Sequence, residues 1–283
     1  MLTDNHTSDA AIGIIGGSGF YRWLADSAAD TDLDTRAVTT PFGDPSAEVT
    51  VGTVSGRRIV FLPRHGTAHE YLPHEIPYRA NLWALRSLGV RAIVAASAVG
   101  SLRSDVAPGS IVVPDQLVDR TSGRAQTYFD RTGFAAGMPG PVHTAFADPY
   151  CARLRSALTA SGTDVQDGGT MVVIDGPRFS TRAESQWYAR QGWSLINMTG
   201  HPEAVLAREL QMCYATACLV TDLDAGVASG DGVTADEVFA RFARHLPELI
   251  AVLEESVGHI DPGTTCDCAQ ADYDVDALLG VPA

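Results

Sequence analysis

Short apolar runs alternate with amphipathic segments along most of the chain, and this alternation limits the fold more than any other feature of the sequence. Several runs are almost wholly apolar, which is typical of strands covered on both faces of a sheet. The runs that we predict to be strands are Ile12–Ile15, Ile59–Leu62, Ala92–Ala96, Ile111–Val113, Met171–Ile174, Leu195–Asn197 and Ala217–Thr221. Strands that alternate with helices favour a single α/β domain, with a mixed or mostly parallel sheet flanked by helices.

The last part of the domain carries the periodicity of a long helix. One apolar face is marked by Val238, Phe239, Phe242, Leu246, Leu249 and Leu253. Thr234 is a candidate N-cap residue, and Glu237 stands three residues later, as in a capping box. We therefore predict a C-terminal helix that begins directly after Thr234.

The net charge of -14 limits the kind of partner that the chain can bind. Such an acidic surface repels nucleic-acid phosphates, so we expect no nucleic-acid partner. The first ten residues are polar, and no apolar run reaches about 18 residues, so we expect neither a secretory signal nor a membrane span. We place the protein in the cytoplasm, and we divide it into a flexible N-terminus (1–10), one folded domain (11–260) and a C-terminal tail (261–283).

Five cysteines stand at irregular spacing, which does not resemble a disulfide framework. Cys151, Cys213 and Cys218 lie in or beside apolar runs, so we expect them to be buried small side chains. Cys266 and Cys268 form a C-x-C pair, but no second pair or His cluster near them in sequence completes a zinc site. We interpret them as free thiols in a mobile tail and expect no metal.

Ligands of α/β sheets bind at the carboxyl ends of the strands, so the residues that follow each predicted strand are candidates for the site. Ser18 lies in a glycine-rich turn after the first strand, and Arg64 and His65 follow the second. Ser97 and Ala98 lie in a turn of small residues after the third strand. Backbone N–H groups, hydroxyls and a guanidinium favour an anion such as phosphate. The alternatives are a tight turn without a ligand and a surface Arg-His pair.

The later strand ends carry groups suited to a sugar and a flat ring. Phe179 can stack on a ring, and Met198 and Thr199 can contact a sugar, although a core phenylalanine and a plain helix entry are the alternatives. Asp222 and Asp224 alternate with an apolar residue, so in an extended segment both point the same way. Two nearby carboxylates push their pKa values apart, so that one can stay protonated as an acid. A helix cap or a metal pair is the alternative.

An ordered set of segments carries a resemblance to a known family. The segments are Thr40–Ser46, Arg64–Gly66, Tyr78–Leu85, Gly100–Arg103, Asp119–Thr121, Gly176–Glu184, Asn197–Thr199, Pro202–Glu209 and Thr221–Asp224. Together they resemble the trimeric purine nucleoside phosphorylases, and among these the 5'-methylthioadenosine phosphorylases. The resemblance extends from Ile12 to about Leu253, so residues 11–260 are identified as a nucleoside phosphorylase domain.

The resemblance implies the phosphorylase/hydrolase-like fold with a mixed, barrel-like sheet, a homotrimer, and no metal or organic cofactor, with inorganic phosphate as co-substrate. It implies that phosphate is held by Ser18, Arg64, His65, Ser97, Ala98 and Thr199. Relatives often have Thr in the turns after the first and third strands, where this chain has Ser18 and Ser97, so the hydroxyl is kept. Met198 would lie against the ribose and Phe179 against the purine, and His69 would belong to the nucleoside site.

Two positions indicate the base. Relatives that prefer 6-oxopurines carry Glu and Asn where this chain has Ser180 and Asp222. A protonated Asp222 can donate to N7 of the departing purine as a general acid, and Asp224 can accept from a 6-amino group. A 6-oxo group would set acceptor against acceptor.

At the 5' end of the sugar, the resemblance implies that His143 reaches in from a neighbouring subunit. Val227 and Val233 are candidates for a thioether pocket, and Gly226, Gly230 and Gly232 make their loop a candidate lid.

The sequence thus predicts phosphorolysis of 5'-methylthioadenosine to adenine and 5-methylthioribose 1-phosphate. The alternatives are a broader purine nucleoside phosphorylase that acts on adenosine or inosine, a methylthioinosine phosphorylase, a nucleosidase that uses water, and a non-catalytic nucleotide-binding protein on the same scaffold.

Overall fold

The structure, a computed structural model, describes residues 10–17, 19–20, 23–24, 33–135, 137–161, 164–227, 232–269 and 272–279. All but the last residue of the predicted flexible N-terminus (1–10) lies outside these ranges.

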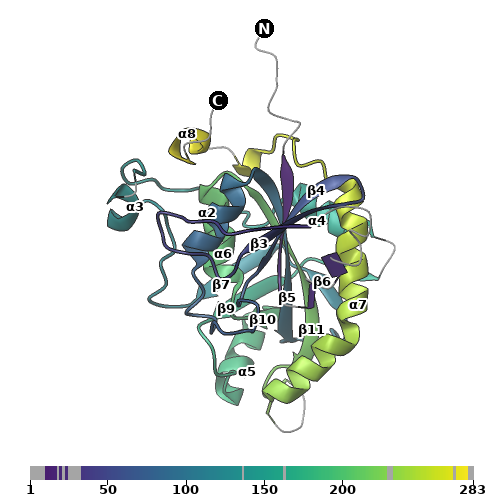
Figure 1. The fold of residues 1–283 in the computed structure, drawn as a ribbon. Helices are drawn as coiled ribbons and strands as arrows, with labels where there is room; N and C mark the ends of the chain where they lie inside the picture. The colour runs from purple at the N-terminus through teal and green to yellow at the C-terminus, as the bar shows by residue number, and fades with distance from the viewer. Residues whose placement is uncertain are drawn as a thin grey trace.

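The described residues form one mixed sheet with helices packed on it (Figure 1). The strands are β1 (Ala11–Gly16), β2 (Asp34–Arg36), β3 (Val49–Val54), β4 (Arg57–Pro63), β5 (Val90–Ser101), β6 (Ile111–Val113), β7 (Gln116–Arg120), β8 (Val165–Asp167), β9 (Thr170–Ile174), β10 (Leu195–Asn197) and β11 (Cys213–Leu223). The helices are α2 (Tyr78–Ser87), α3 (Arg131–Ala135), α4 (Ala152–Thr159), α5 (Arg182–Arg190), α6 (Gly200–Glu209), α7 (Ala235–His259), the 3-10 turn η1 (Asp267–Ala269) and α8 (Val275–Leu279).

The sheet branches at β5. Its main path runs β2-β3-β4-β1-β5-β10-β9-β7. Strand β11 pairs with β5 from Ala92 to Ser101, and β6 and then β8 continue the sheet from β11. Strands β1, β4, β5 and β11 are mutually parallel, so their carboxyl ends meet at one edge. Strand β10 runs antiparallel to the end of β5 and brings its own carboxyl end to the same region. Among the described residues the sheet does not close into a barrel, but the expected mixed sheet flanked by helices is confirmed.

Strand β5 separates two hydrophobic layers because its side chains alternate between the faces of the sheet. Ile93 and Ala95 pack in one layer with α2 and α6, whereas Val94 and Ala96 pack in the other with α4 and α7. Figure 1 shows α2 and α6 on one side of the sheet and α7 along the other. Covering both faces explains why the predicted strands are apolar throughout.

All the runs predicted as strands are strands, but β2, β3, β7 and β8 were not predicted. Strand β2 is exposed, and β7 is polar and half-buried, so neither shows the apolar run on which the prediction depended. Helix α7 begins as predicted, because the Thr234 hydroxyl accepts from the backbone N–H of Glu237. The Glu237 carboxylate accepts from the Thr234 hydroxyl at 2.9 Å.

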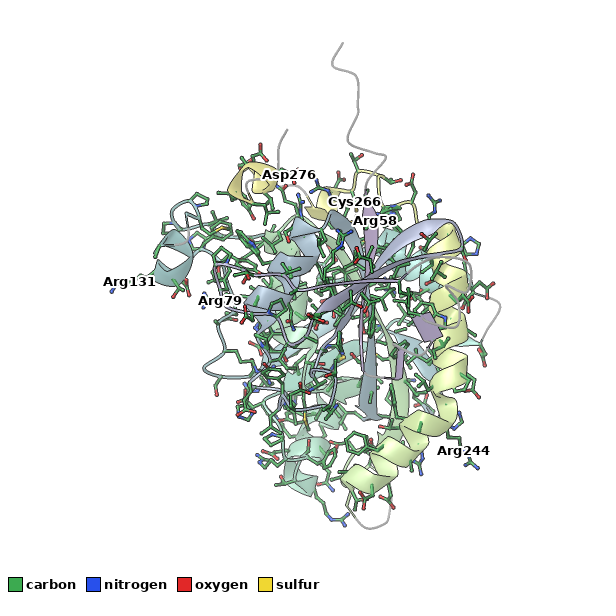
Figure 2. All side chains as sticks on the ribbon, viewed as in Figure 1. Arg58, Arg79, Arg131, Arg244, Cys266 and Asp276 are labelled. Atoms are coloured by element: carbon green, nitrogen blue, oxygen red, sulfur yellow. The ribbon has the colours of Figure 1, made fainter. Side chains whose placement is uncertain are left out.

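The segment after α7 packs back on the domain at the end of the molecule where α7 finishes (Figure 2). Asp276 in α8 accepts from Arg86 and Arg91, both at 2.8 Å. Cys266 and Cys268 are free thiols, as expected, and the fold groups them with two further cysteines at a spacing that could hold a metal ion. Cys151 and Cys213 lie beside them, because the fold joins segments more than fifty residues apart.

No helix in the described ranges is long and apolar enough to cross a membrane.

Candidate active site

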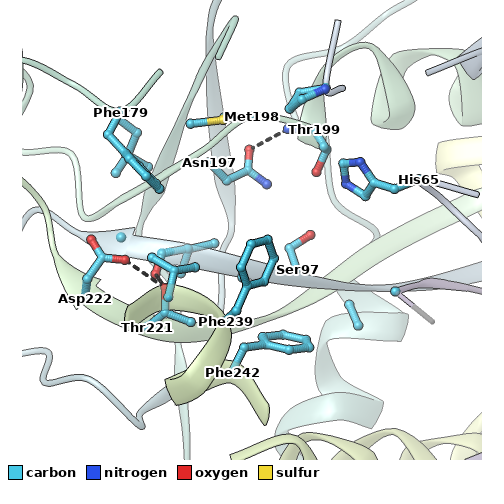
Figure 3. A pocket seen from close by; sticks show the side chains of 18 of the residues that line it. His65, Ser97, Phe179, Asn197, Met198, Thr199, Thr221, Asp222, Phe239 and Phe242 are labelled. Atoms are coloured by element: carbon cyan, nitrogen blue, oxygen red, sulfur yellow. Dashed lines mark hydrogen bonds between the residues drawn. The ribbon is translucent and has the colours of Figure 1, made fainter. Parts of the chain in front are cut away.

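A cavity of about 680 Å³ opens at the edge of the sheet where the carboxyl ends of the strands meet (Figure 3). Its walls come from the ends of β1, β4, β9, β10 and β11 and the segments that follow them, the second half of β5, and one face of α7. The predicted site residues that line it are Arg64, His65, His69, Ser97, Ala98, Phe179, Ser180, Met198, Thr199, Asp222 and Asp224. The strand ends therefore bring together almost the whole predicted set.

Arg64 lies at one end of the cavity and is 3% exposed. Its Nε and Nη2 donate to the Glu203 carboxylate at 2.7 and 2.8 Å, and its Nη1 donates to the Ala96 carbonyl at 2.8 Å. Burial opposes the charge on Arg64, but Glu203 outweighs it and raises the pKa of the guanidinium. A guanidinium has five N–H groups, so two remain for a ligand after these contacts.

Glu203 is itself buried, and no sequence pattern pointed to its role. Besides Arg64, it accepts a hydrogen bond from the Tyr214 hydroxyl at 2.7 Å. The carboxylate thus fixes the position of Arg64 with a bidentate contact and balances its charge. Because both contacts of a bidentate pair must form at once, they fix the orientation of the guanidinium. A cation that positions a small anion needs such a fixed orientation.

His65 lies beside Arg64 and is held in one tautomer. Its Nδ1 lies 2.9 Å from the Tyr71 carbonyl, which can only accept, so Nδ1 carries the hydrogen. Burial lowers the pKa of His65 to about 4, and the positive charge of Arg64 acts in the same direction. The ring is therefore neutral near pH 7, with Nε2 as an acceptor. It stacks on His69 with 4.5 Å between ring centroids.

Three further predicted anion ligands lie at this end. Ser97 and Thr199 are buried hydroxyls, and Ala98 offers its backbone on the exposed part of β5. Figure 3 shows Ser97, Thr199 and His65 on the same side of the cavity. Ser18 lies outside the described residues, although its neighbours Gly17 and Gly19 line the cavity.

Asp222, near the end of β11, lies at the other end with Phe179 (Figure 3), and Asp224, directly after the strand, also lines the cavity. Burial raises the pKa of Asp222 to about 6, a hydrogen bond from Thr221 partly opposes this, and the nearby Asp224 adds to it. The Thr221 hydroxyl donates to Asp222 Oδ2 at 2.8 Å. Asp222 Oδ1 approaches the backbone of Gly100, where a Cβ would come within 3.0 Å of it. A larger residue at position 100 would therefore crowd this carboxylate and the Ile196 side chain.

Several buried polar atoms around the cavity have no hydrogen-bond partner among the described residues. Asp224 Oδ2, Ser180 Oγ and Asn197 Nδ2 are of this kind. Burial raises the pKa of Asp224, although the Ser185 and Ser180 hydroxyls lie near enough to lower it in part. All three side chains border the cavity, so donor and acceptor groups line this part of its wall. Asn197 was not among the predicted site residues.

Met198 lies between the two ends of the cavity in Figure 3, on the wall opposite Ser97. The Met198 sulfur packs over Gly176, which has φ of 64°. A Cβ at Gly176 would overlap that sulfur, and this backbone conformation is strained for other residues. The Gly-Pro turn after β9 thus holds the thioether in place over the cavity.

One wall is the apolar face of α7, which the sequence predicted without assigning it to the site. Its first turns contribute Val238, Phe239, Phe242, Ala243 and Leu246 to the cavity, and later turns contribute Leu249 and Leu253 to the core. Phe239 is 56% exposed, so it lies at the mouth. An apolar stripe that extends beyond the core to the start of a helix was the signal that could have identified this wall.

The predicted thioether pocket is wrong, because neither Val227 nor Val233 lines the cavity. Val227 packs instead against a small hydrophobic cluster that includes Leu102. The predicted lid falls mainly on residues 228–231, which lie outside the described residues and include Gly230. His143 is exposed and does not line this chain's cavity.

The cavity suits chemistry between an anion and a leaving group that gains a proton. One end offers a fixed cation, a neutral imidazole and hydroxyls, and the other offers a carboxyl that is half-protonated near pH 6. Among the described residues, one group of three or more side chains is spaced so that it could hold a metal ion. Its members are Cys151, Cys213, Cys266 and Cys268, and none of them lines this cavity.

Comparisons with known proteins agree with this arrangement. A family model described as the phosphorylase superfamily matches residues 11–257. An S-methyl-5'-thioadenosine phosphorylase of Mycolicibacterium smegmatis is 59% identical over 255 residues, which covers 90% of this chain and 93% of that protein. A purine nucleoside phosphorylase of Streptomyces coelicolor is 51% identical over 264 residues, 92% of each chain. The solved methylthioadenosine phosphorylase of Schistosoma mansoni in complex with adenine superposes with a TM-score of 0.80 and 37% identity, covering 88% of this chain and 91% of that one. The chain therefore belongs to the phosphorylase superfamily.

Proposed function

We propose that this protein cleaves 5'-methylthioadenosine with inorganic phosphate, giving adenine and 5-methylthioribose 1-phosphate. The observation that carries the proposal is that one cavity joins an anion-binding end to a carboxylate pair. The names of the relatives from Mycolicibacterium smegmatis and Schistosoma mansoni support the same substrate.

Phosphate binds at the Arg64 end in this proposal. The two free N–H groups of Arg64, the Ser97 and Thr199 hydroxyls, and the backbone of Ala98 hold its oxygens, and Ser18 completes the set from the first turn. The neutral ring of His65 accepts the hydrogen of a protonated phosphate oxygen at Nε2. These contacts place a phosphate oxygen beneath C1' of the sugar, so that the reaction becomes effectively unimolecular.

The glycosidic bond breaks before the new bond is complete. As the C1'–N9 bond lengthens, the sugar becomes an oxocarbenium-like cation, which the bound phosphate dianion stabilises. The electrons of the broken bond remain on the purine, and Asp222 transfers its proton to N7. A phosphate oxygen then bonds to C1', so charge is balanced without a metal or an organic cofactor. The raised pKa keeps part of Asp222 protonated near neutral pH, as this role requires.

Asp224 selects the base. Its carboxylate borders the cavity, and the exocyclic amino group of a 6-aminopurine supplies a donor to it. A 6-oxopurine would place an oxygen against this carboxylate, which an enclosed site rejects strongly. Phe179 packs on the purine ring and Met198 on the ribose, with Ser180 and Asn197 as additional hydrogen-bonding partners.

The apolar wall of α7 selects the 5' substituent in place of the valines predicted from sequence. Phe239, Phe242 and Leu246 face the cavity and offer no hydrogen bond to a 5'-hydroxyl, whereas a methylthio group gains free energy from contact with them. His69 lies edge-on to Phe239 at 5.6 Å between centroids and borders the same region. We further propose a cytoplasmic homotrimer in which His143 of each subunit reaches the 5' end of its neighbour's nucleoside.

The test is release of base from a panel of nucleosides, with and without phosphate. We expect 5'-methylthioadenosine to be cleaved faster than adenosine, inosine or 5'-methylthioinosine, and only when phosphate is present. If inosine or methylthioinosine reacts ten times faster than methylthioadenosine, the assignment of Asp224 is wrong. Equal rates without phosphate would indicate a nucleosidase, and binding without turnover would indicate a nucleotide-binding protein.

A broader purine nucleoside phosphorylase is the second candidate function. The observation that favours it is the similarity to the Streptomyces coelicolor protein that carries that name. Comparable kcat/KM values for adenosine and methylthioadenosine would favour this candidate, because they would show that the α7 wall does not discriminate at the 5' position. Light scattering of the purified protein tests the trimer independently of either substrate.

A further inference from the structure

Four of the five cysteines gather at one point outside the cavity. They are Cys151, Cys213, Cys266 and Cys268, and their sulfur atoms all lie within 4.8 Å of one another. The separate distances are 3.6 Å between Cys151 and Cys266, 3.3 Å between Cys213 and Cys268, and 3.0 Å between Cys266 and Cys268. All four are free thiols, and none of them lines the cavity.

The cluster joins three parts of the fold. Cys151 is the N-cap residue of α4, and Cys213 is the first residue of β11. Cys266 and Cys268 come from the segment after α7, on either side of the first residue of η1. Figure 2 shows Cys266 at the same end of the molecule as Asp276 of α8. Four thiols from three segments converge at the edge of one hydrophobic cluster, and two of the sulfur–sulfur distances are as short as 3.0 and 3.3 Å.

The spacing matches a tetrahedral tetrathiolate site. Zinc binds cysteine sulfur at about 2.3 Å, so neighbouring sulfurs of a tetrahedral site lie about 3.8 Å apart. The sulfurs here span that value, from 3.0 Å to at most 4.8 Å. Four sulfur ligands in this geometry indicate zinc or iron, and structural zinc sites with four protein ligands are closed to substrate.

The surroundings favour negative charge on the sulfurs. Arg153 Nη2 contacts Cys213 Sγ at 3.7 Å, and Arg153 Nε is buried without a hydrogen-bond partner among the described residues. Cys151 lies at the N-terminus of α4, where the helix dipole and free N–H groups stabilise a thiolate. A zinc ion with four thiolates carries a net charge of about −2, so a guanidinium and a helix N-terminus beside it are suitable neighbours.

We propose that Cys151, Cys213, Cys266 and Cys268 bind one zinc ion as a structural site. On binding, each thiol loses its proton to solvent and forms one Zn–S bond, with no change in oxidation state. The metal fastens the segment after α7 to α4 and β11. It acts together with the ion pairs of Asp276 with Arg86 and Arg91, which hold α8 to the domain. This proposal replaces the expectation of no metal, and it is independent of the nucleoside reaction.

The experiment measures metal in the full-length protein, purified without chelator from cells grown with zinc. Elemental analysis is expected to give about one zinc per chain for the wild type, and less than about a tenth of that for Cys266→Ser and Cys268→Ser. Cys218→Ala is the matched control: Cys218 is buried on the same strand as Cys213 but lies outside the cluster, so its zinc content is expected to equal that of the wild type.

Two measurements on the wild type avoid dependence on the folding of the variants. Replacement of zinc by cobalt(II) is expected to give the intense near-ultraviolet charge-transfer bands of a tetrahedral thiolate site. After denaturation with chelator and without reductant, all five cysteines are expected to react with a thiol reagent. Removal of the metal is also expected to lower the Tm.

Four results would overturn the proposal. They are zinc retained at full stoichiometry in both serine variants, absence of bound metal from a protein with five reactive thiols, one reactive thiol with the other four in disulfides, and iron in place of zinc.

Discussion

Replacement of Asp222 by asparagine is expected to reduce turnover and, at the same time, to stabilise the ligand-free protein at alkaline pH. The amide keeps the shape of the side chain and still donates a hydrogen bond, but it transfers no proton. Loss of a positioned general acid lowers kcat by about 10²–10⁴-fold, so we expect a decrease in that range for 5'-methylthioadenosine.

The effect on stability follows from the raised pKa. Burial raises the pKa of Asp222 from 3.8 in the unfolded chain to about 6 in the folded protein, so the folded state binds the proton more tightly. Asp222 therefore contributes stability that is fully present below pH 4 and is lost as the pH rises through 6. Between pH 4 and pH 8 this shift costs the wild type about 3 kcal/mol of unfolding free energy. The Asp222→Asn variant has no charge at this position and avoids that loss.

The assay is urea denaturation of both proteins across pH 4 to pH 8, without nucleoside or phosphate. The difference in unfolding free energy between Asp222→Asn and the wild type reports this carboxyl together with its coupling to Asp224, because the other ionisable groups are common to both. Asp164→Asn, at an exposed position, is the control. The reasoning is refuted if the variant gains no stability relative to the wild type between pH 4 and pH 8, or if turnover of the variant stays within twofold.

Three further changes test other parts of the site. Glu203→Gln removes the partner of buried Arg64, so we expect a loss of about 3–5 kcal/mol in chemical denaturation and a higher KM for phosphate; an unchanged midpoint and KM would contradict this. Phe242→Ala shortens the apolar wall of α7, so kcat/KM is expected to fall more for 5'-methylthioadenosine than for adenosine, and equal decreases would show that the wall does not select the thioether. Gly176→Ala places a Cβ against the Met198 sulfur, and we expect a higher KM for the nucleoside with little change for phosphate, whereas unaltered nucleoside kinetics would contradict that contact.

Much of the fold was predictable because apolar residues in a strand buried on both faces leave an unmistakable local pattern. The runs in β1, β4, β5 and β11 are of this kind. Strands β2 and β7 carry no such run, and their positions depend on pairing with β3 and β9. Such pairing is set by the residues of the partner strand, and the composition of the strand itself does not encode it.

Most of the candidate site was also predictable, since polar residues directly after strands gather wherever parallel strands end together. Arg64, Thr199 and Asp222 were identified in this way. Glu203 was not, because a carboxylate near the start of a helix has many ordinary roles. Its pairing with Arg64 depends on side chains 139 positions apart in the chain.

The sequence by itself determined the apolar strands, the long helix α7 and the chemical groups at the strand ends, because each depends on neighbours along the chain. Only the tertiary structure decided which face of α7 borders the cavity and which cysteines meet. In sequence, Cys151 and Cys266 are 115 residues apart, yet their sulfurs lie 3.6 Å apart. Contacts of this kind arise from the packing of whole helices and strands on the sheet, so no local pattern of residues specifies them.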